Sequence, residues 1–309
     1  MTILLLMGGA GIRLLAQDDV PTKTRVDRRS DYIFPSKEMQ KLMSFVALDS
    51  TVMPAAFRQT TDNRIEDPSA SLTSFFDKLG KMSRPVRIVH IGDSHVRGHV
   101  FPYVMRKLLE DDFGSEAVAN YKVDYGTTGL ASETGKPGIV YHIVGVNGAT
   151  CKSYNTPERI AEIVRLKPDL IISSFGTNEA HGRGYRKDDH RMQMEALLRN
   201  LQHQCPEASI LMTTPPGAYV RYGRRRIINQ RTPLVVEEER KFSNEHHLAF
   251  WNMYEIVGGE KHACTNWTAA KMFQRDKIHF TAEGYKLMGL LLHEAFIKAY
   301  NNYVASTID

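Results

Sequence analysis

The chain has 309 residues, of which 42% are hydrophobic and 24% charged, and this composition excludes disordered and fibrous classes. Its formal net charge of +5 is a mild excess, which favours an anionic partner and does not by itself indicate nucleic acid. The length allows one large α/β domain together with an N-terminal extension.

The N-terminus predicts export. Residues 1–16 are largely apolar and end in a small residue, Ala16, before the polar stretch that starts at Gln17, as in a secretory signal peptide. The stretch lacks a basic segment before its apolar run, so a buried N-terminal strand or helix is the alternative. The stretch is too short to span a bilayer and is interrupted by glycines, so no stable membrane insertion is expected. A secreted or periplasmic location follows from the signal.

The three cysteines, Cys151, Cys205 and Cys264, are dispersed and show no paired spacing of the kind that binds zinc. Buried free thiols are predicted, with one disulfide as the alternative. The sequence therefore predicts no metal site, and no organic cofactor is expected either.

A linker and a helical extension are predicted ahead of the main domain. Residues 17–35 are polar and charged without an apolar period, and we interpret them as the linker. Residues 36–84 form the extension, with helices predicted over Glu38–Leu48 and Leu72–Met82 from apolar residues at helical spacing.

Residues 85–305 alternate between strand and helix patterns. Strands are predicted over 86–91, 139–146, 170–174, 210–213 and around 250–251, and helices over 101–110, from 157, around 194–201, 237–248 and 282–300. Thr156 and Thr281 are expected to cap two of these helices. Alternation of this kind predicts a three-layer α/β/α sandwich with a mostly parallel five-stranded, flavodoxin-like sheet. The basic run from Arg221 to Arg231 is interpreted as a solvated loop.

The first motif that bears on chemistry follows the strand over 86–91. Gly92, Asp93 and Ser94 suit a tight turn that exposes the serine hydroxyl and points backbone N–H groups outward. Taken alone, the tripeptide is equally consistent with an Asx turn that ends a strand.

Two further motifs follow strands. Gly148, in Asn147–Thr150, allows a ligand to approach the backbone closely, and Asn178, in Phe175–Ala180, carries an amide that can donate to a developing oxyanion. Each motif alone is typical of an ordinary turn. Ligands of parallel α/β sheets bind at the carboxyl ends of the strands, where both motifs are expected.

The fourth motif, Asp276–His279, precedes the last helix. A histidine three residues after an aspartate can direct Nε2 toward a serine while Nδ1–H meets the carboxylate, which fixes the tautomer and stabilises the imidazolium. An exposed pair at a helix start is the alternative for this motif alone.

Taken together and in this order, Ser94, Gly148, Asn178 and His279 with Asp276 resemble the four blocks of the SGNH (GDSL-like) hydrolases. The resemblance covers most of residues 70–300. It implies that Ser94 is the nucleophile, with His279 and Asp276 as its partners, and that the backbone N–H groups of Ser94 and Gly148 and the amide of Asn178 form the oxyanion hole.

The resemblance is closer to one branch. The segments 92–98, 175–180 and 249–252, then Gly258-Gly259, Trp267 and 276–285, look like the bacterial peptidoglycan O-acetylesterases, periplasmic enzymes that remove acetyl from the 6-hydroxyl of N-acetylmuramic acid. Some members carry a carbohydrate-binding module between the serine and glycine blocks, and the separation of Ser94 from Gly148 is too short for one. Glycan recognition is then expected from the catalytic domain itself.

The function predicted is a serine esterase, a carboxylic ester hydrolase, that removes O-acetyl groups from a carbohydrate, with peptidoglycan as the expected polymer. Its partner is then an O-acetylated glycan, and nucleic acid is not expected. The alternatives are a sugar O-acetyltransferase, another SGNH acylhydrolase such as a lipase or thioesterase, and a non-catalytic glycan-binding pseudo-hydrolase. Candidate substrate contacts are Arg97, His95 and Trp267. For these three, an ordinary surface position, packing beside the nucleophile and core packing are the respective alternatives.

Overall fold

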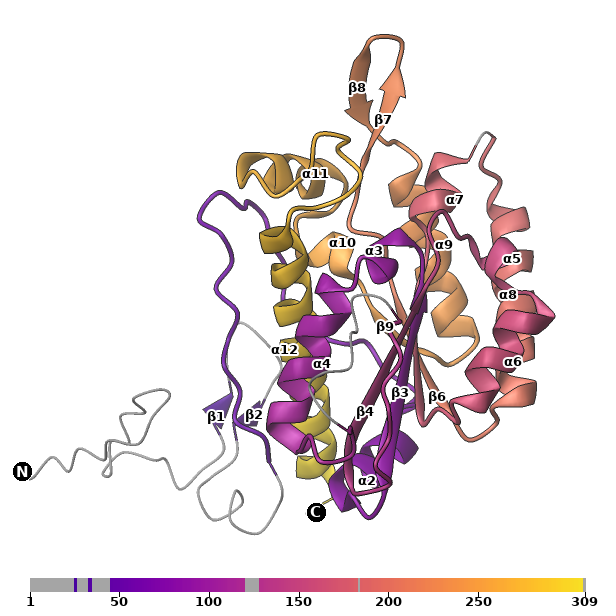
Figure 1. Ribbon diagram of the computed structural model, residues 1–309. Coiled ribbons are helices and arrows are strands. Elements are labelled where there is room, and N and C mark those ends of the chain that lie inside the picture. Colours follow the sequence, from indigo (N-terminus) through magenta and orange to yellow (C-terminus); the bar gives the residue numbers. More distant parts are fainter. Residues whose placement is uncertain (1–24, 27–32, 35–44, 120–127, 183, 308–309) are drawn as a thin grey trace, which may run out of the picture.

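The computed structural model describes residues 25–26, 33–34, 45–119, 128–182 and 184–307 (Figure 1). The predicted signal peptide over 1–16 lies outside the described residues. Within the predicted linker, the short strands β1 (Arg25–Val26) and β2 (Ile33–Phe34) pair antiparallel. No helix in the described part of the chain has the length and apolarity needed to cross a membrane.

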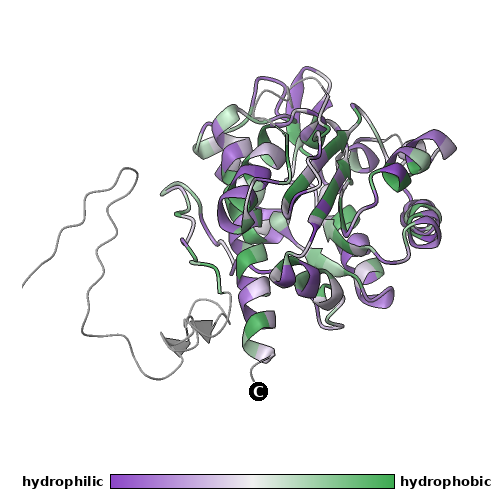
Figure 2. Ribbon diagram, turned by 60° about the horizontal axis from the view of Figure 1, so that its bottom comes forward, coloured by the Kyte–Doolittle hydropathy of each residue, from purple (hydrophilic) through white to green (hydrophobic). Residues whose placement is uncertain are grey.

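A five-stranded parallel sheet forms the centre of the molecule, as predicted. Its order is β4-β3-β5-β6-β9, with every neighbouring pair parallel. The strands are β3 (Pro85–Gly92), β4 (Gly138–Gly145), β5 (Leu170–Ser174), β6 (Ser209–Thr213) and β9 (Ala249–Trp251). Their apolar runs are buried on both faces, which is why they are continuous rather than alternating (Figure 2).

Helices cover both faces of the sheet and make the predicted three-layer sandwich (Figure 1). One face carries α2 (Thr73–Lys81), α4 (Val100–Phe113) and α12 (Ala282–Ser306), and the other α5 (Cys151–Tyr154), α6 (Pro157–Arg165), α8 (Lys187–Gln204) and α9 (Thr232–Glu245). Four further helices are α3 (Ser94–Arg97), α7 (Thr177–His181), α10 (Met253–Ile256) and α11 (Gly259–Ala269). Successive residues of β3 show the two cores, since Ile88 belongs to one and Val89 to the other.

The predicted helix caps are present. The Thr156 hydroxyl accepts a hydrogen bond from the backbone N–H of Arg159 at the start of α6, and Thr281 accepts from Gly284 at the start of α12. Both satisfy an N–H group that has no partner inside the helix.

The N-terminal extension differs from the helices predicted for it. The helix over Leu72–Met82 is confirmed as α2, but residues 45–48 of the one predicted over Glu38–Leu48 are not helical, and 38–44 lie outside the described residues. The segment 45–71 runs over the domain instead, and at Glu66 it pairs with Phe250 of the edge strand β9. Its apolar residues are partly buried against the core that also contains α12, although the segment forms no helix. The helical spacing of these residues therefore did not predict the backbone.

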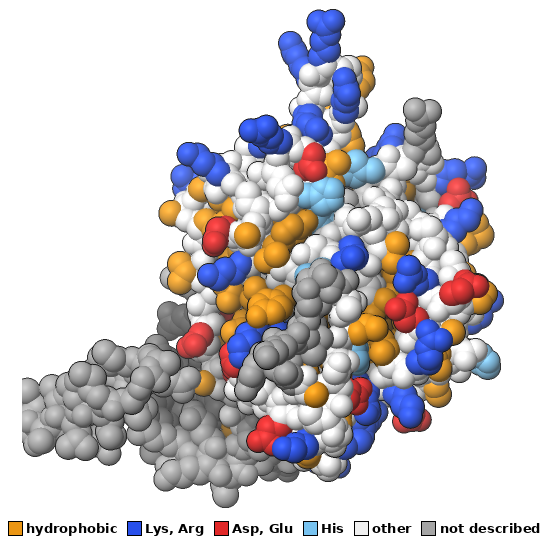
Figure 3. Space-filling view, in the orientation of Figure 1, with side chains coloured by type: hydrophobic (Ala, Val, Ile, Leu, Met, Phe, Trp, Pro, Cys, Tyr) orange, Lys and Arg blue, Asp and Glu red, His pale blue; other side chains and the backbone are white. Residues whose placement is uncertain are grey.

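The basic run is a β-hairpin and not the loop predicted for Arg221–Arg231. Strands β7 (Tyr219–Tyr222) and β8 (Arg225–Ile228) pair antiparallel and project beyond the sheet, where basic side chains gather (Figures 1 and 3). A two-residue connection starting with Gly223, whose φ is 59°, matches a tight hairpin turn. The arginines of this segment are typical of a solvated loop, and the ends of both strands next to the turn are exposed, so the sequence shows no buried strand pattern.

Replacing Asn63 tests whether the segment 45–71 is an integral part of the domain. The buried amide of Asn63 accepts a hydrogen bond from Trp251 Nε1 at 3.0 Å and donates to the Leu291 carbonyl at 2.8 Å. Asn63→Ala leaves both groups buried and unpaired, so we expect the free energy of unfolding to fall by about 1–3 kcal/mol in urea titrations. The exposed Asn302→Ala is the control, and an equal effect of both variants would contradict the account.

Candidate active site

Ser94 lies at the carboxyl end of β3, as the first residue of the short helix α3. A Cβ atom on Gly92 would collide with the Ser174 carbonyl of β5 and with the Val96 side chain, so only glycine permits this turn. The carboxylate of Asp93 accepts the backbone N–H of His95 at 2.8 Å and caps α3. The turn leaves the Ser94 side chain half-buried at the mouth of the sheet.

Asp276 and His279 lie on a tight loop before α12. Asp276 Oδ1 accepts the backbone N–H groups of Ile278 and His279, both at 3.0 Å. Lys277 between them has a φ of 58°, in the left-handed region that non-glycine residues seldom occupy. This turn places the imidazole directly over its own aspartate.

Three side chains form a continuous hydrogen-bonded chain. Asp276 Oδ2 lies 2.6 Å from His279 Nδ1, and His279 Nε2 lies 2.9 Å from Ser94 Oγ. Since an ionised carboxylate can only accept, Nδ1 carries the proton and donates it to Asp276, which leaves Nε2 to accept from the serine hydroxyl. The sequence predicted this contact, and the structure brings all three residues together.

Asp276 is suited to remain ionised. Partial burial opposes ionisation, but the hydrogen bonds from the His279 side chain and from two backbone N–H groups hold the pKa of Asp276 below its ordinary value. A carboxylate in this state favours a positive charge on the imidazole.

The hairpin braces this loop from outside. The backbone N–H of Tyr219 in β7 donates to the Lys277 carbonyl at 2.9 Å, and the Lys277 ammonium lies 5.9 Å from the Tyr219 ring centroid. The base of the basic hairpin is thereby tied to the strained residue between Asp276 and His279.

The glycine and asparagine motifs meet the serine turn. Asn178 in α7 donates its amide to the Ala149 carbonyl at 2.9 Å, and the same nitrogen lies 3.4 Å from Asp93 Oδ2. Gly148, with a φ of 72°, is exposed, and no heavy atom of the described residues lies within 4 Å of the place a Cβ would take. The amide of Asn178 therefore contacts both the turn that carries Ser94 and the loop that carries Gly148.

Of the three predicted substrate contacts, one lies at the site and two do not. Arg97 lines an open cavity of about 640 Å³ beside Ser94 and His279. His95 is buried and its Nδ1 lies 2.9 Å from the Tyr285 hydroxyl, so it packs beneath the site as the alternative had it. Trp267 is fully buried and donates to the Pro216 carbonyl, so the expected sugar contact is wrong: the ring fills the core against Phe280.

Several residues at the site were not predicted from the sequence. Asn147, Gln274 and Tyr285 line the same cavity. Asn147 and Tyr285 stand inside segments that the sequence singles out for other residues, and no sequence pattern marks Gln274. Among the described residues that line the cavity, Arg97 is the one with a permanent charge.

Three acids lie buried behind the site. Asp93 and Glu179 belong to motifs named above, but their burial was not predicted, and Glu239 was not singled out at all. Burial raises the pKa of Asp93 from 3.8 to about 7, and the nearby Glu179 adds to this shift. Burial also raises the pKa of Glu179, although backbone N–H groups of Cys151 and Gly176 donate to it. Burial and the charges of Glu179 and Asp93 raise the pKa of Glu239 well above its ordinary value.

Comparison with known families decides the class of the protein. Residues 91–287 match the GDSL-like Lipase/Acylhydrolase family. The chain belongs to this family. It is therefore a carboxylic ester hydrolase of the GDSL (SGNH) type, and the fold and family resemblance predicted from the sequence are confirmed.

The chain is also similar to solved structures. A peptidoglycan O-acetylesterase is 19% identical, with a TM-score of 0.66 over 77% of this chain and 99% of the other. A GDSL-like lipase from Bacteroides thetaiotaomicron is 18% identical (TM-score 0.46; 74% and 99% covered), and an acetyl xylan esterase is 14% identical (TM-score 0.45; 72% and 100%). The curated proteins contain no match to the sequence.

The buried Asp93 predicts a pH dependence of the stability of this GDSL hydrolase. Its folded-state pKa of about 7 lies above the ordinary 3.8, so between these values the folded chain holds a proton that the unfolded chain has released. Stability due to this group is therefore lost as the pH rises toward 7. Asp93→Asn retains an N-cap side chain without the charge, and we expect it to gain stability relative to wild type between about pH 5 and pH 8.

The measurement is urea unfolding of both proteins at the two pH values, with the exposed Asp188→Asn as control. A difference between wild type and Asp93→Asn that is the same at both values would contradict the burial of an ionisable group at this position.

Proposed function

We propose that this chain is a serine esterase that removes O-acetyl groups from a carbohydrate, and that the carbohydrate is peptidoglycan O-acetylated on N-acetylmuramic acid. The observation that carries the proposal is the hydrogen-bonded chain from Asp276 through His279 to Ser94. A serine hydroxyl becomes an effective nucleophile when such a base takes its proton.

In the acylation step, Ser94 Oγ attacks the ester carbonyl carbon while His279 Nε2 accepts the hydroxyl proton. The carbonyl oxygen becomes an oxyanion, and the resulting imidazolium is stabilised by the Asp276 carboxylate. The bond between the carbonyl carbon and the sugar oxygen then breaks, His279 protonates the leaving sugar oxygen, and an acetyl-serine remains.

The oxyanion is met by the backbone N–H groups of Ser94 and Gly148 and the side-chain amide of Asn178. The position of Asn178 supports this assignment, because its amide lies between the serine and glycine loops and its contact with Asp93 Oδ2, at 3.4 Å, is too long to bind that side of the amide firmly. In the deacylation step a water gives a proton to His279 and attacks the acetyl carbon. The bond from that carbon to Ser94 Oγ then breaks, His279 returns the proton to Oγ, and acetate leaves.

Two features favour a polymeric, anionic glycan. The cavity beside Ser94 is open and carries Arg97, and the chain has a formal net charge of +5. Peptidoglycan bears carboxylates on its peptides, which an arginine at the mouth can bind. The fold shared with a peptidoglycan O-acetylesterase is consistent with this choice, and a secretory signal at residues 1–16 would deliver the enzyme to that polymer.

Asn178→Ala tests the oxyanion assignment. Loss of one donor should lower kcat on 4-nitrophenyl acetate by about 10²–10³ with little change in KM, because the interaction forms fully only in the transition state. The exposed Asn244→Ala on α9 is the control, and equal thermal melting of the two variants checks the fold. A variant at position 178 with wild-type kcat would remove this residue from the mechanism.

A substrate panel tests the polymer. We expect acetate release, measured by mass spectrometry, to be faster from O-acetylated peptidoglycan than from acetylated xylan, with Ser94→Ala inactive on both. Arg97→Ala should raise KM for peptidoglycan and leave 4-nitrophenyl acetate turnover unchanged. Preference for xylan, or acetylated glycan product in place of free acetate, would refute the assignment to peptidoglycan or to hydrolysis respectively.

A further inference from the structure

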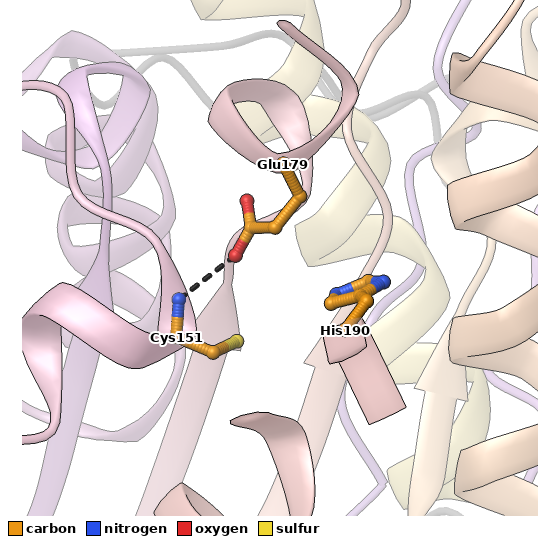
Figure 4. A group of neighbouring side chains, drawn as sticks. All are labelled: Cys151, Glu179 and His190. Atoms are coloured by element: carbon orange, nitrogen blue, oxygen red, sulfur yellow. Dashed lines mark hydrogen bonds between the residues drawn. The ribbon is translucent and has the colours of Figure 1, made fainter. Parts of the chain in front are cut away.

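A cysteine, a carboxylate and an imidazole converge behind the catalytic face. Cys151 begins α5, Glu179 lies in α7 and His190 lies in the first turn of α8. One potential ligand atom from each lies within 4.8 Å of the others, and all three residues are buried (Figure 4). Three separate helices thus bring a thiol, a carboxylate and an imidazole close together.

The histidine has an unused nitrogen. His190 is 2% exposed, and its buried Nε2 has no hydrogen-bond partner among the described residues. Its Nδ1 lies 3.3 Å from the Tyr185 hydroxyl, which fits the usual arrangement in which a metal-binding imidazole hydrogen-bonds through its other nitrogen. In Figure 4 a ring nitrogen of His190 lies on the side that faces Cys151 and Glu179. Buried polar atoms seldom lack a partner, so the Nε2 atom of His190 is available to a ligand.

The carboxylates nearby lack compensating cations. Within the described residues, neither Glu179 nor Glu239 forms an ion pair with a lysine or arginine. Glu239 is 2% exposed, and within the part of the chain that the structure describes its Oε2 has no hydrogen-bond partner. Its other oxygen lies next to Gly176, at the start of the turn that carries Glu179. A cation bound at Glu179 would offset the buried charge of that carboxylate.

We propose that Cys151, Glu179 and His190 form a structural site for a zinc ion. Thiolate sulfur, imidazole nitrogen and carboxylate oxygen are the ligands that zinc takes in proteins, and buried sites with four protein ligands are structural. Glu239 is not one of the residues whose ligand atoms lie within 4.8 Å of one another, so its carboxylate would have to move toward them to take the fourth position. The dispersed cysteines gave no sign of this site because its other ligands are not cysteines.

The site would stabilise the loops on which catalysis depends. Cys151 follows Gly148 by three residues, and Glu179 directly follows Asn178. A zinc ion bound to both would fix the separation of the two loops assigned to the oxyanion hole; this consequence rests on the proposed function. The existing hydrogen bond from the Cys151 backbone N–H to Glu179, at 2.8 Å, already joins the same loops.

Metal binding is tested without reference to activity. The full chain is treated with a chelator, desalted and titrated with Co²⁺ and then with Zn²⁺. We expect about one equivalent of Co²⁺ to produce a sulfur-to-cobalt charge-transfer band and intense tetrahedral ligand-field bands, both removed by one equivalent of Zn²⁺. Zn²⁺ should also raise the melting temperature of the apo protein.

Matched variants locate the site. Cys151→Ala should abolish the charge-transfer band, and His190→Gln should lose tight binding, whereas Cys205→Ala, which removes another buried thiol, should bind as wild type does. Wild-type protein that shows no cobalt bands and no shift in melting temperature would overturn the proposal, as would an unchanged band in Cys151→Ala. A chain that binds zinc but hydrolyses no ester would refute the proposed function alone, and an active esterase that binds none would refute the zinc site alone.

Discussion

The hydrogen bond between Ser94 Oγ and His279 Nε2 joins residues 185 positions apart, and most of the domain serves to hold it. Ser94 is held by a glycine turn wedged against the end of β5, and His279 by a left-handed turn at Lys277 that is tied to the hairpin. Neither loop could keep its atoms within hydrogen-bond distance of the other without the rigid parallel sheet between them. A small rotation of either loop would leave a half-buried hydroxyl with no base.

This arrangement buries acidic side chains, which lowers the free energy of unfolding of the domain. Asp93 caps α3 and orders the nucleophile turn, yet burial favours its protonated form. Glu179 orders the glycine and asparagine loops through the backbone N–H groups of Cys151 and Gly176, also in a buried position. Groups that organise the site thereby lower the stability of the domain at neutral pH, and a cation bound at Glu179 would offset part of that loss.

Much of the fold could be predicted from the sequence because the strands are buried on both faces, so that β3 and β5 are continuous apolar runs between turn residues. The caps at Thr156 and Thr281 depend on local chemistry alone. The segment 45–71 could not be predicted, because its conformation is set by contacts with distant β9 and α12. The hairpin was hidden for the opposite reason: both its strands are exposed and charged.

The residues of the candidate site likewise fall into those that could be predicted from the sequence and those that could not. Ser94, Asn178, Asp276 and His279 stand in recognisable local motifs, so their meeting could be predicted from the order of the motifs along a parallel fold. Trp267 shows the limit, because nothing in its helix tells whether an indole faces a cavity or the core. Glu239 and His190 lie on amphipathic helices where a buried polar residue has no sequence signature, and only the packing of α8 and α9 shows it.

Labelling with a fluorophosphonate tests the central claim most directly, because the reagent reacts with a serine whose proton is taken by a base. Intact-mass and peptide mass spectrometry should show one adduct, on Ser94, formed far more slowly in His279→Ala. A wild-type protein that stays unlabelled, or an adduct that forms on Ser94 at the same rate in both proteins, would contradict the account.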